Sequence, residues 1–111
     1  MEHADASPEV LSTDLPDEAF LLDVREDDEW AAGHAPSAVH VRLGDLGDHV
    51  RELPQDREVY VICRSGARSA YAVQALTGAG WTAVNVADGM TGWAVCGRPM
   101  ISEDGTEPYV A

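Results

Sequence analysis

Short apolar runs alternate with segments of helical character through the middle of the chain. The apolar runs have the length and composition of buried strands, and they lie at residues 20–24, 39–41, 59–62 and 82–86. The run at 59–62 (VYVI) is continuously apolar and mostly β-branched, which is typical of a strand covered on both faces. The alternation predicts an α/β fold: an open, mostly parallel sheet with helices on both faces.

Three helices are predicted between these strands, at residues 27–32, 46–53 and 69–79. The first has acidic residues in its first turn and is followed by Gly33, and the second ends before Pro54. The third places its apolar residues on one face and is followed by Gly80, a common residue beyond a helix C-terminus. Each helix therefore carries its own start or stop signal.

The length of 111 residues predicts a single domain over residues 1–111. Apolar residues make up 45% of the sequence and charged residues 24%, which is the balance of a folded globular protein. The predicted core spans about residues 8–100. Residues 1–8 and the tail at 102–108 are polar, and we expect both to be loose.

Acidic residues outnumber basic residues 20 to 7, and the formal net charge is −13. Such a surface repels phosphate backbones and anionic lipids, so we expect neither nucleic acid nor a membrane as a partner. All the basic residues are arginine, which excludes catalysis through a lysine Schiff base. No apolar stretch approaches the roughly 20 residues of a membrane span, and the N-terminus lacks a secretory signal, so we expect a cytoplasmic protein.

Cys63 directly follows the clearest strand and lies just before the helix predicted at 69–79. Ligands of parallel α/β sheets bind at this edge, beyond the carboxyl ends of the strands. The helix N-terminus and the guanidinium groups of Arg64 and Arg68 favour a negative charge here, so we expect a lowered thiol pKa. A lone cysteine is often simply a buried thiol, but this combination of surroundings favours a nucleophile.

The two cysteines are expected to have different roles. Three small residues follow Cys63 closely and allow the backbone to curl around its sulfur with the N–H groups pointing inward: Ser65, Gly66 and Ala67. Cys96 lies 33 positions away and forms no CxxC pair, so a disulfide between the two is not expected in a reducing compartment. Cys96 is interpreted as incidental, and the alternative is a resolving thiol that accepts sulfur from Cys63.

The loop sequence at 63–69 (CRSGARS) resembles the catalytic loop of rhodaneses, a sulfurtransferase family in which a cysteine starts the loop after the central parallel strand. Other segments resemble further family motifs: 21–25 (LLDVR), Glu29-Trp30, 33–38 (GHAPSA), and 88–90 (DGM) with Trp93. The resemblance covers about residues 8–100, and the departures from the family pattern lie outside the loop.

The resemblance implies a sulfurtransferase, for which no cofactor is predicted. Cys63 is expected to take the outer sulfur of thiosulfate or of a persulfide, hold it as a persulfide, and pass it to cyanide or a thiol. Arg64 and Arg68 are expected to bind the anionic end of the donor. The substrate is expected to contact the remaining loop residues, Ser65, Gly66, Ala67 and Ser69. The implied partners are a small-molecule sulfur donor and a thiol acceptor, and no protein partner is identified.

Two other functions compete with this one. Cysteine-dependent phosphatases and arsenate reductases use a Cys-x5-Arg loop, but only four residues separate Cys63 from Arg68. The shorter loop encloses room for a sulfur atom rather than for a tetrahedral oxyanion. A rhodanese-like module that relays persulfide to a protein partner, or that senses sulfur, stays open.

Asp23 and Arg25 lie at the end of a strand on the same edge as the loop, and we expect them to support it. Asp23 either holds loop N–H groups or an arginine, or the strand end forms an ordinary ion pair with Glu26 or Glu29. His34 is expected to stabilise a turn, and Trp93 is expected to be a core or rim residue, with a wall of the site as the alternative. The histidines show no ligand spacing with either cysteine, so no metal is predicted.

Overall fold

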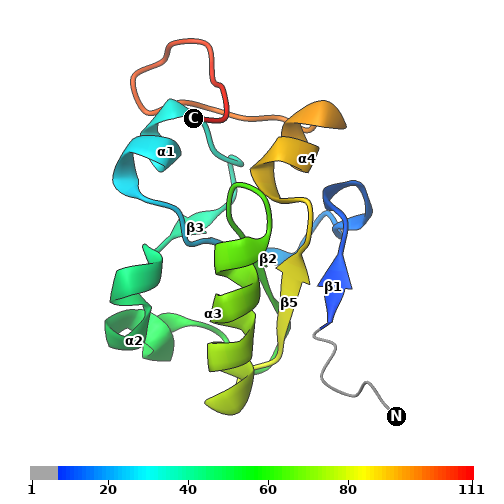
Figure 1. Ribbon diagram of the computed structural model, residues 1–111, viewed down its shortest axis with the longest axis vertical. Helices are drawn as coiled ribbons and strands as arrows, with labels where there is room; N and C mark the ends of the chain where they lie inside the picture. The colour runs from blue at the N-terminus through cyan, green and yellow to red at the C-terminus, as the bar shows by residue number, and fades with distance from the viewer. Residues whose placement is uncertain (1–7) are drawn as a thin grey trace.

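The computed structural model describes residues 8–111 (Figure 1). At the centre of this part of the chain is a five-stranded sheet with the order β1-β5-β4-β2-β3. Every neighbouring pair in it is parallel. The strands are β1 (Glu9–Val10), β2 (Phe20–Asp23), β3 (Val39–His40), β4 (Val59–Ile62) and β5 (Ala83–Val86). The predicted parallel α/β sheet is confirmed.

Helices cover both faces of the sheet, as predicted (Figure 1). They are α1 (Asp27–Ala32), α2 (Leu46–His49), α3 (Ala67–Gly78) and α4 (Gly89–Val95). On one face, Leu46 of α2 and Leu76 of α3 belong to the same buried apolar cluster. On the other face, Met90 and Trp93 of α4 belong to a second cluster. None of the helices described is both long and apolar enough to cross a membrane.

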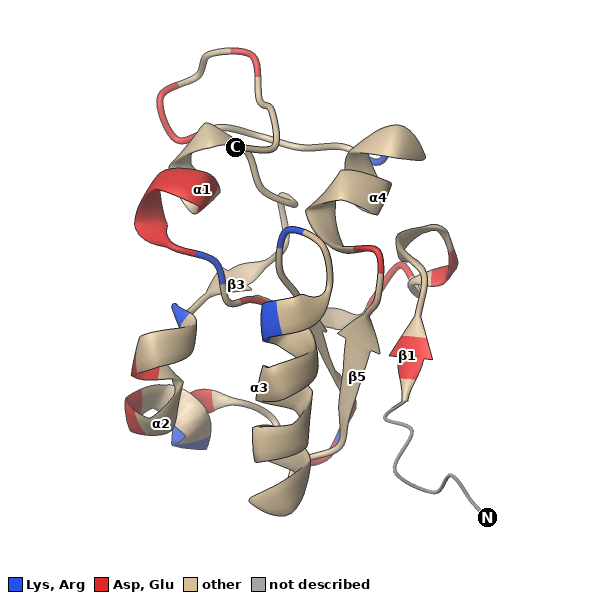
Figure 2. Cartoon of the chain, in the orientation of Figure 1, with Lys and Arg blue, Asp and Glu red and all other residues tan. Residues whose placement is uncertain are grey.

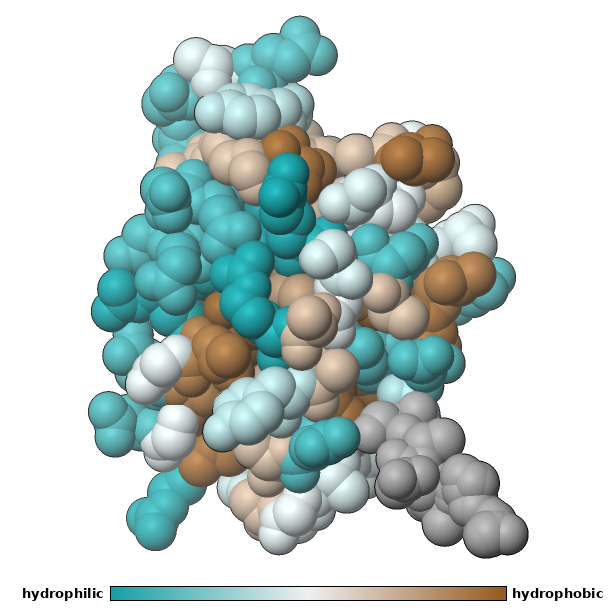
Figure 3. Space-filling view, in the orientation of Figure 1, coloured by the Kyte–Doolittle hydropathy of each residue, from teal (hydrophilic) through white to brown (hydrophobic). Residues whose placement is uncertain are grey.

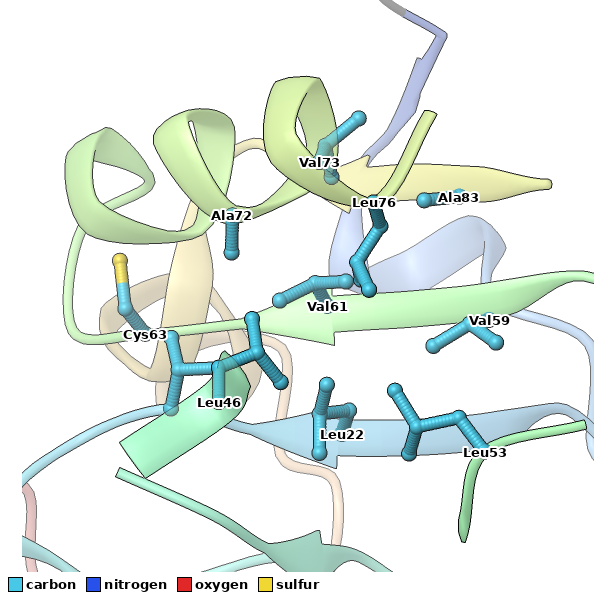
Figure 4. Close-up of a cluster of buried hydrophobic side chains, with 11 residues drawn as sticks. Leu22, Leu46, Leu53, Val59, Val61, Cys63, Ala72, Val73, Leu76 and Ala83 are labelled. Carbon is cyan, nitrogen blue, oxygen red and sulfur yellow. The ribbon is translucent and has the colours of Figure 1, made fainter. Parts of the chain in front are cut away.

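Successive residues of β4 point to opposite faces, because side chains alternate along a strand. Val59 and Val61 lie in the cluster beneath α2 and α3, whereas Tyr60 and Ile62 lie in the cluster beneath α4. Figure 4 shows the first cluster, in which Cys63 lies at the end of the row of β4 side chains. The cysteine therefore lies where the apolar core meets the carboxyl edge of the sheet.

Two helix boundaries differ from the prediction for local reasons. α3 begins at Ala67 rather than Ser69, because Gly66 in a left-handed conformation (φ 103°) turns the loop directly into the helix. The segment predicted as one helix at 46–53 is α2 followed by a 3-10 turn over Val50–Glu52. Pro54 restricts Leu53, the residue before it, to extended backbone, so the helical segment ends at Glu52.

β1 and α4 were not among the predicted elements. β1 consists of two residues and pairs only with Asn85 and Val86 of β5, so it depends on a distant partner. α4 contains Gly89 and Gly92, and glycine is a weak helix former. Of the N-terminal segment predicted to be loose, residues 1–7 lie outside the described residues. The carbonyl of Pro8 accepts a hydrogen bond from the N–H of Asn85 at 2.9 Å.

The C-terminal tail differs from the prediction of a loose segment at 102–108. The N–H of Glu103 donates to the carbonyl of Ala31 at 3.0 Å, and the N–H of Tyr109 donates to the carbonyl of Ala32 at 3.1 Å. These carbonyls belong to the last two residues of α1, and the last carbonyls of a helix have no hydrogen-bond partner within the helix. The tail satisfies them, and this long-range role cannot be inferred from the polarity of the segment.

Gly33 lies beneath the tail, and a Cβ added there would come within 2.7 Å of Met100 Cε and 2.8 Å of the backbone nitrogen of Tyr109. We expect Gly33→Ala to displace the tail and to lower the free energy of unfolding by about 1–3 kcal/mol. Urea unfolding and limited proteolysis measure the two effects. Gly44→Ala is the matched control, because nothing lies within 4 Å of a Cβ there. Equal effects of the two substitutions would contradict the role given to the tail.

Candidate active site

Cys63 is the first residue after β4, and the loop at 63–66 leads from it into α3 (Figure 1). The residue is 1% exposed. The backbone N–H groups of Gly66 and Ser69 donate to its Sγ at 3.1 and 3.4 Å. The hydroxyl of Ser69 lies 3.2 Å from the same sulfur. The loop therefore surrounds a buried sulfur atom with hydrogen-bond donors.

These donors shift the pKa of the Cys63 thiol. Burial on its own raises the pKa of Cys63, because a thiolate is poorly solvated inside the protein. Hydrogen bonds from the Ser69 hydroxyl and from the backbone N–H groups of Ser69, Gly66 and Ser65 act in the opposite direction. They outweigh the effect of burial, so the pKa of the Cys63 thiol lies below its ordinary value. The loop favours the thiolate, which is the nucleophilic form.

Two glycines allow the loop to take this shape. Gly66 has a φ of 103°, and a Cβ there would strike the carbonyl of Ala87. Gly89 has a φ of 59°, and a Cβ there would strike the backbone of the cysteine loop. Because the two segments approach so closely, the N–H of Met90 donates to the carbonyl of Cys63 at 2.8 Å. The start of α4 therefore holds the start of the loop.

Asp23 and Arg25 form an ion pair whose side chains are both 0% exposed. Arg25 Nε donates to Asp23 Oδ1 at 3.0 Å, and Nη2 donates to Oδ2 at 2.8 Å. The same guanidinium donates to the carbonyls of Glu29 at 3.3 Å and Gly33 at 2.8 Å. Asp23 therefore holds Arg25, its neighbour at the strand end, rather than an arginine of the loop. The pair ties the end of β2 to α1.

The guanidinium of Arg68 is already engaged. Nη1 and Nη2 donate to the two carboxylate oxygens of Glu29, each at 2.8 Å. The hydrogen bond from Arg68 lowers the pKa of Glu29 to about 2, and Glu29 in turn raises the pKa of Arg68. Figure 2 shows the acidic first turn of α1 beside the loop and the start of α3. The sequence predicts that Arg68 binds the sulfur donor, and it carries no signal that Glu29 is the partner of Arg68.

The remaining loop residues lie around the sulfur in different ways. Ser69 is buried, whereas Arg64, Ser65 and Ala67 are exposed. Within residues 8–111, Arg64 has no ion-pair partner. Asn85 of β5 donates from Nδ2 to the carbonyl of Gly66 at 3.2 Å, a support for the loop that is not predicted from the sequence. Its only signal in the sequence is a polar residue inside an otherwise apolar stretch of strand.

The family described as Rhodanese-like domain matches residues 7–96. The chain belongs to the rhodanese-like domain family. It is 46% identical to YtwF of Bacillus subtilis (strain 168) over 77 residues, which cover 69% of this chain and 75% of YtwF. It is 36% identical over 100 residues to a protein of Allochromatium vinosum named Sulfurtransferase, covering 87% of this chain and 94% of that protein. The crystal structure of a rhodanese-related protein from Thermoplasma volcanium matches with a TM-score of 0.79 and 30% identity, covering 85% of this chain and 97% of that one.

Other residues singled out in the sequence have structural contacts in this rhodanese-like domain. His34 is buried, with Nδ1 2.9 Å from the carbonyl of Trp30 and its ring stacked on the Trp30 ring at 3.5 Å. Trp93 is a core residue, as predicted, and its Nε1 donates to the carbonyl of Pro99 at 3.0 Å. Cys96 is an exposed free thiol. Across residues 8–111, no group of three or more His, Cys, Asp or Glu is arranged to hold a metal ion.

Replacing Ser69 with Ala removes one donor to the sulfur and keeps the backbone N–H. We expect the pKa of Cys63 to rise, because the thiolate loses a hydrogen bond. The pH dependence of the rate at which iodoacetamide alkylates Cys63, followed by peptide mass mapping, measures the change. Ser65→Ala is the control, because Ser65 acts on the sulfur through a backbone N–H that Ala retains. If the midpoint of the pH dependence of the alkylation rate were unchanged in Ser69→Ala, the hydroxyl would not act on the thiolate.

Asp23→Asn and Arg25→Met each leave one buried charge without its partner. We expect each to lower the free energy of unfolding by about 3–5 kcal/mol. The control is Arg42→Met, because the Arg42–Asp45 pair at 2.8 Å has side chains that are 43% and 42% exposed. We expect that substitution to cost about 1 kcal/mol or less. Similar losses in the Arg25 and Arg42 variants, measured by urea unfolding, would contradict the role given to the buried pair.

Proposed function

We propose that this rhodanese-like domain is a sulfurtransferase that carries a sulfane sulfur on Cys63. The observation that carries the proposal is the convergence of hydrogen-bond donors from Gly66 and Ser69 on the buried Cys63 sulfur. Such donors stabilise an anion at the loop both before sulfur transfer, as a thiolate, and after it, as a persulfide. The Allochromatium vinosum relative named Sulfurtransferase supports the same activity.

In the first half-reaction, the Cys63 thiolate attacks the outer sulfur of thiosulfate. A new S–S bond forms as the old one breaks, and sulfite leaves with the electron pair of the broken bond. A persulfide donor R–S–SH reacts in the same way and releases the thiolate RS⁻. The product is a persulfide on Cys63, held in a covalent intermediate until an acceptor arrives.

In the second half-reaction, cyanide or a thiolate attacks the terminal sulfur of the persulfide. The bond to Cys63 breaks, and its electron pair returns to Sγ as the thiolate. A thiol with a lowered pKa is a better leaving group, so the donors from Gly66 and Ser69 favour this step as well. No general base is required beside Cys63, because the attacking and leaving groups are both anions.

The competing functions have less support. Cysteine-dependent phosphatases bind the phosphoryl oxygens with the arginine that ends the Cys-x5-Arg loop. Here the corresponding arginine, Arg68, follows after only four residues, and both its terminal nitrogens are bonded to Glu29. A persulfide relay to a protein partner shares the first half-reaction and differs only in the acceptor. Both cysteines are free thiols, which fits a reducing compartment such as the cytoplasm.

The proposal predicts that a sulfur donor adds one sulfur atom to Cys63 and none to Cys96. Intact mass measurement and peptide mapping after treatment with thiosulfate or a small-molecule persulfide test this prediction. Cys96→Ser should still gain the sulfur atom, and Cys63→Ser should not. A sulfur adduct that persists in Cys63→Ser and disappears in Cys96→Ser would refute the assignment of Cys63.

A further inference from the structure

Glu29 holds Arg68 in a two-point ion pair at the edge of the cysteine loop. Glu29 Oε1 also accepts a hydrogen bond from the N–H of Glu26 at 2.9 Å, which fixes the carboxylate in the first turn of α1. The pKa of Glu29 is about 2, chiefly because of Arg68, so this carboxylate is charged at neutral pH. The Glu29–Arg68 pair therefore brings no net charge to the loop.

The other charged residues near the loop do not replace the positive charge of Arg68 that Glu29 neutralises. Arg64 is exposed, and it has no ion-pair partner in the described part of the chain. The N-terminal end of α1 adds three exposed carboxylates, Glu26, Asp27 and Asp28, of which Asp27 lies 3.6 Å from the guanidinium of Arg42. Figure 3 shows hydrophilic surface running from α1 to the start of α3. The approach to Cys63 combines one unpaired arginine with an acidic helix turn, on a chain whose net charge is −13.

We infer that Glu29 determines which sulfur donors reach Cys63: it disfavours dianions such as thiosulfate and leaves the site to donors of lower charge, such as hydropersulfides of small thiols. The inference rests on the proposed function. Thiosulfate brings two negative charges to a thiolate, whereas a hydropersulfide brings at most one. Coulomb repulsion grows with the product of the charges, so the thiosulfate reaction suffers more from the neutralised Arg68.

The favoured transfer is balanced in atoms and electrons. The Cys63 thiolate attacks the terminal sulfur of R–S–SH, the new S–S bond forms on Sγ, and the S–S bond of the donor breaks. The electron pair of that bond leaves on RS⁻, and the proton stays on the transferred sulfur. No oxidant or reductant is consumed.

The test is Glu29→Gln, which removes the charge and keeps a side chain able to complete the N-terminal hydrogen bonding of α1. We expect the KM for thiosulfate to fall about fivefold, the effect of one partly exposed ion pair. The KM for 2-mercaptoethanol hydropersulfide should change less than about twofold, because a donor with at most one charge is less sensitive to the lost charge. Sulfate, a dianion that cannot donate sulfur, should inhibit the variant more strongly than the unmodified protein.

The matched control is Asp28→Asn, which removes one charge from the same turn without touching the Arg68 pair. It should change the thiosulfate KM by less than about twofold, because exposed charges are screened. Glu29→Ser is a second variant that removes every side-chain contact with Arg68, and it should act like Glu29→Gln.

Two results would overturn the inference. A thiosulfate KM that is unchanged or raised in both Glu29 variants would show that Glu29 only positions Arg68. An equal fall in KM for thiosulfate and the hydropersulfide would show that Glu29 does not select between donors. A failure of every donor to load sulfur onto the unmodified protein would instead refute the proposed function, and it is seen before any variant is compared.

Discussion

A thiolate buried at the edge of an apolar core is stable only when hydrogen-bond donors surround it, and this constraint on Cys63 organises the carboxyl edge of the sheet. The donors come from a loop that turns back on the sulfur within a few residues, and the turn needs the left-handed backbone of Gly66. Two neighbouring segments hold the loop. The start of α4 packs closely against it because Gly89 has no side chain, and Asn85 of β5 donates a hydrogen bond to the carbonyl of Gly66.

A second layer of polar contacts connects the loop to α1. The buried Asp23–Arg25 pair holds backbone carbonyls of α1 and of the residue after it, and α1 in turn places Glu29 against Arg68. Every member of this network has a partner, which is the condition for buried polar groups to stabilise one arrangement. The two layers therefore have different effects. The neutral hydrogen-bond donors of the loop stabilise negative charge on the sulfur, whereas α1 sets the charge that an approaching sulfur donor meets.

The fold class and the position of Cys63 could be predicted from sequence, because both depend on local signals. The apolar run before Cys63 identifies the central strand, and the small residues after it identify a tight turn into a helix. The Glu29–Arg68 pair could not be predicted, because it joins residues 39 positions apart through the packing of α1 against the loop. The contacts of the C-terminal tail and the strand β1 could not be predicted for the same reason. Each forms through backbone hydrogen bonds to a segment that is distant in sequence.

The most direct test of the central claim is a crystal structure of the protein after treatment with a small-molecule hydropersulfide. The account predicts one additional sulfur atom bonded to Cys63 Sγ, with the backbone N–H groups of the loop pointing at it. Soaking Cys96→Ser in the same donor should give the same density. An unmodified Cys63, or a sulfur atom bonded to Cys63 but turned away from the loop N–H groups, would contradict the claim that the loop is built to hold an anionic sulfur.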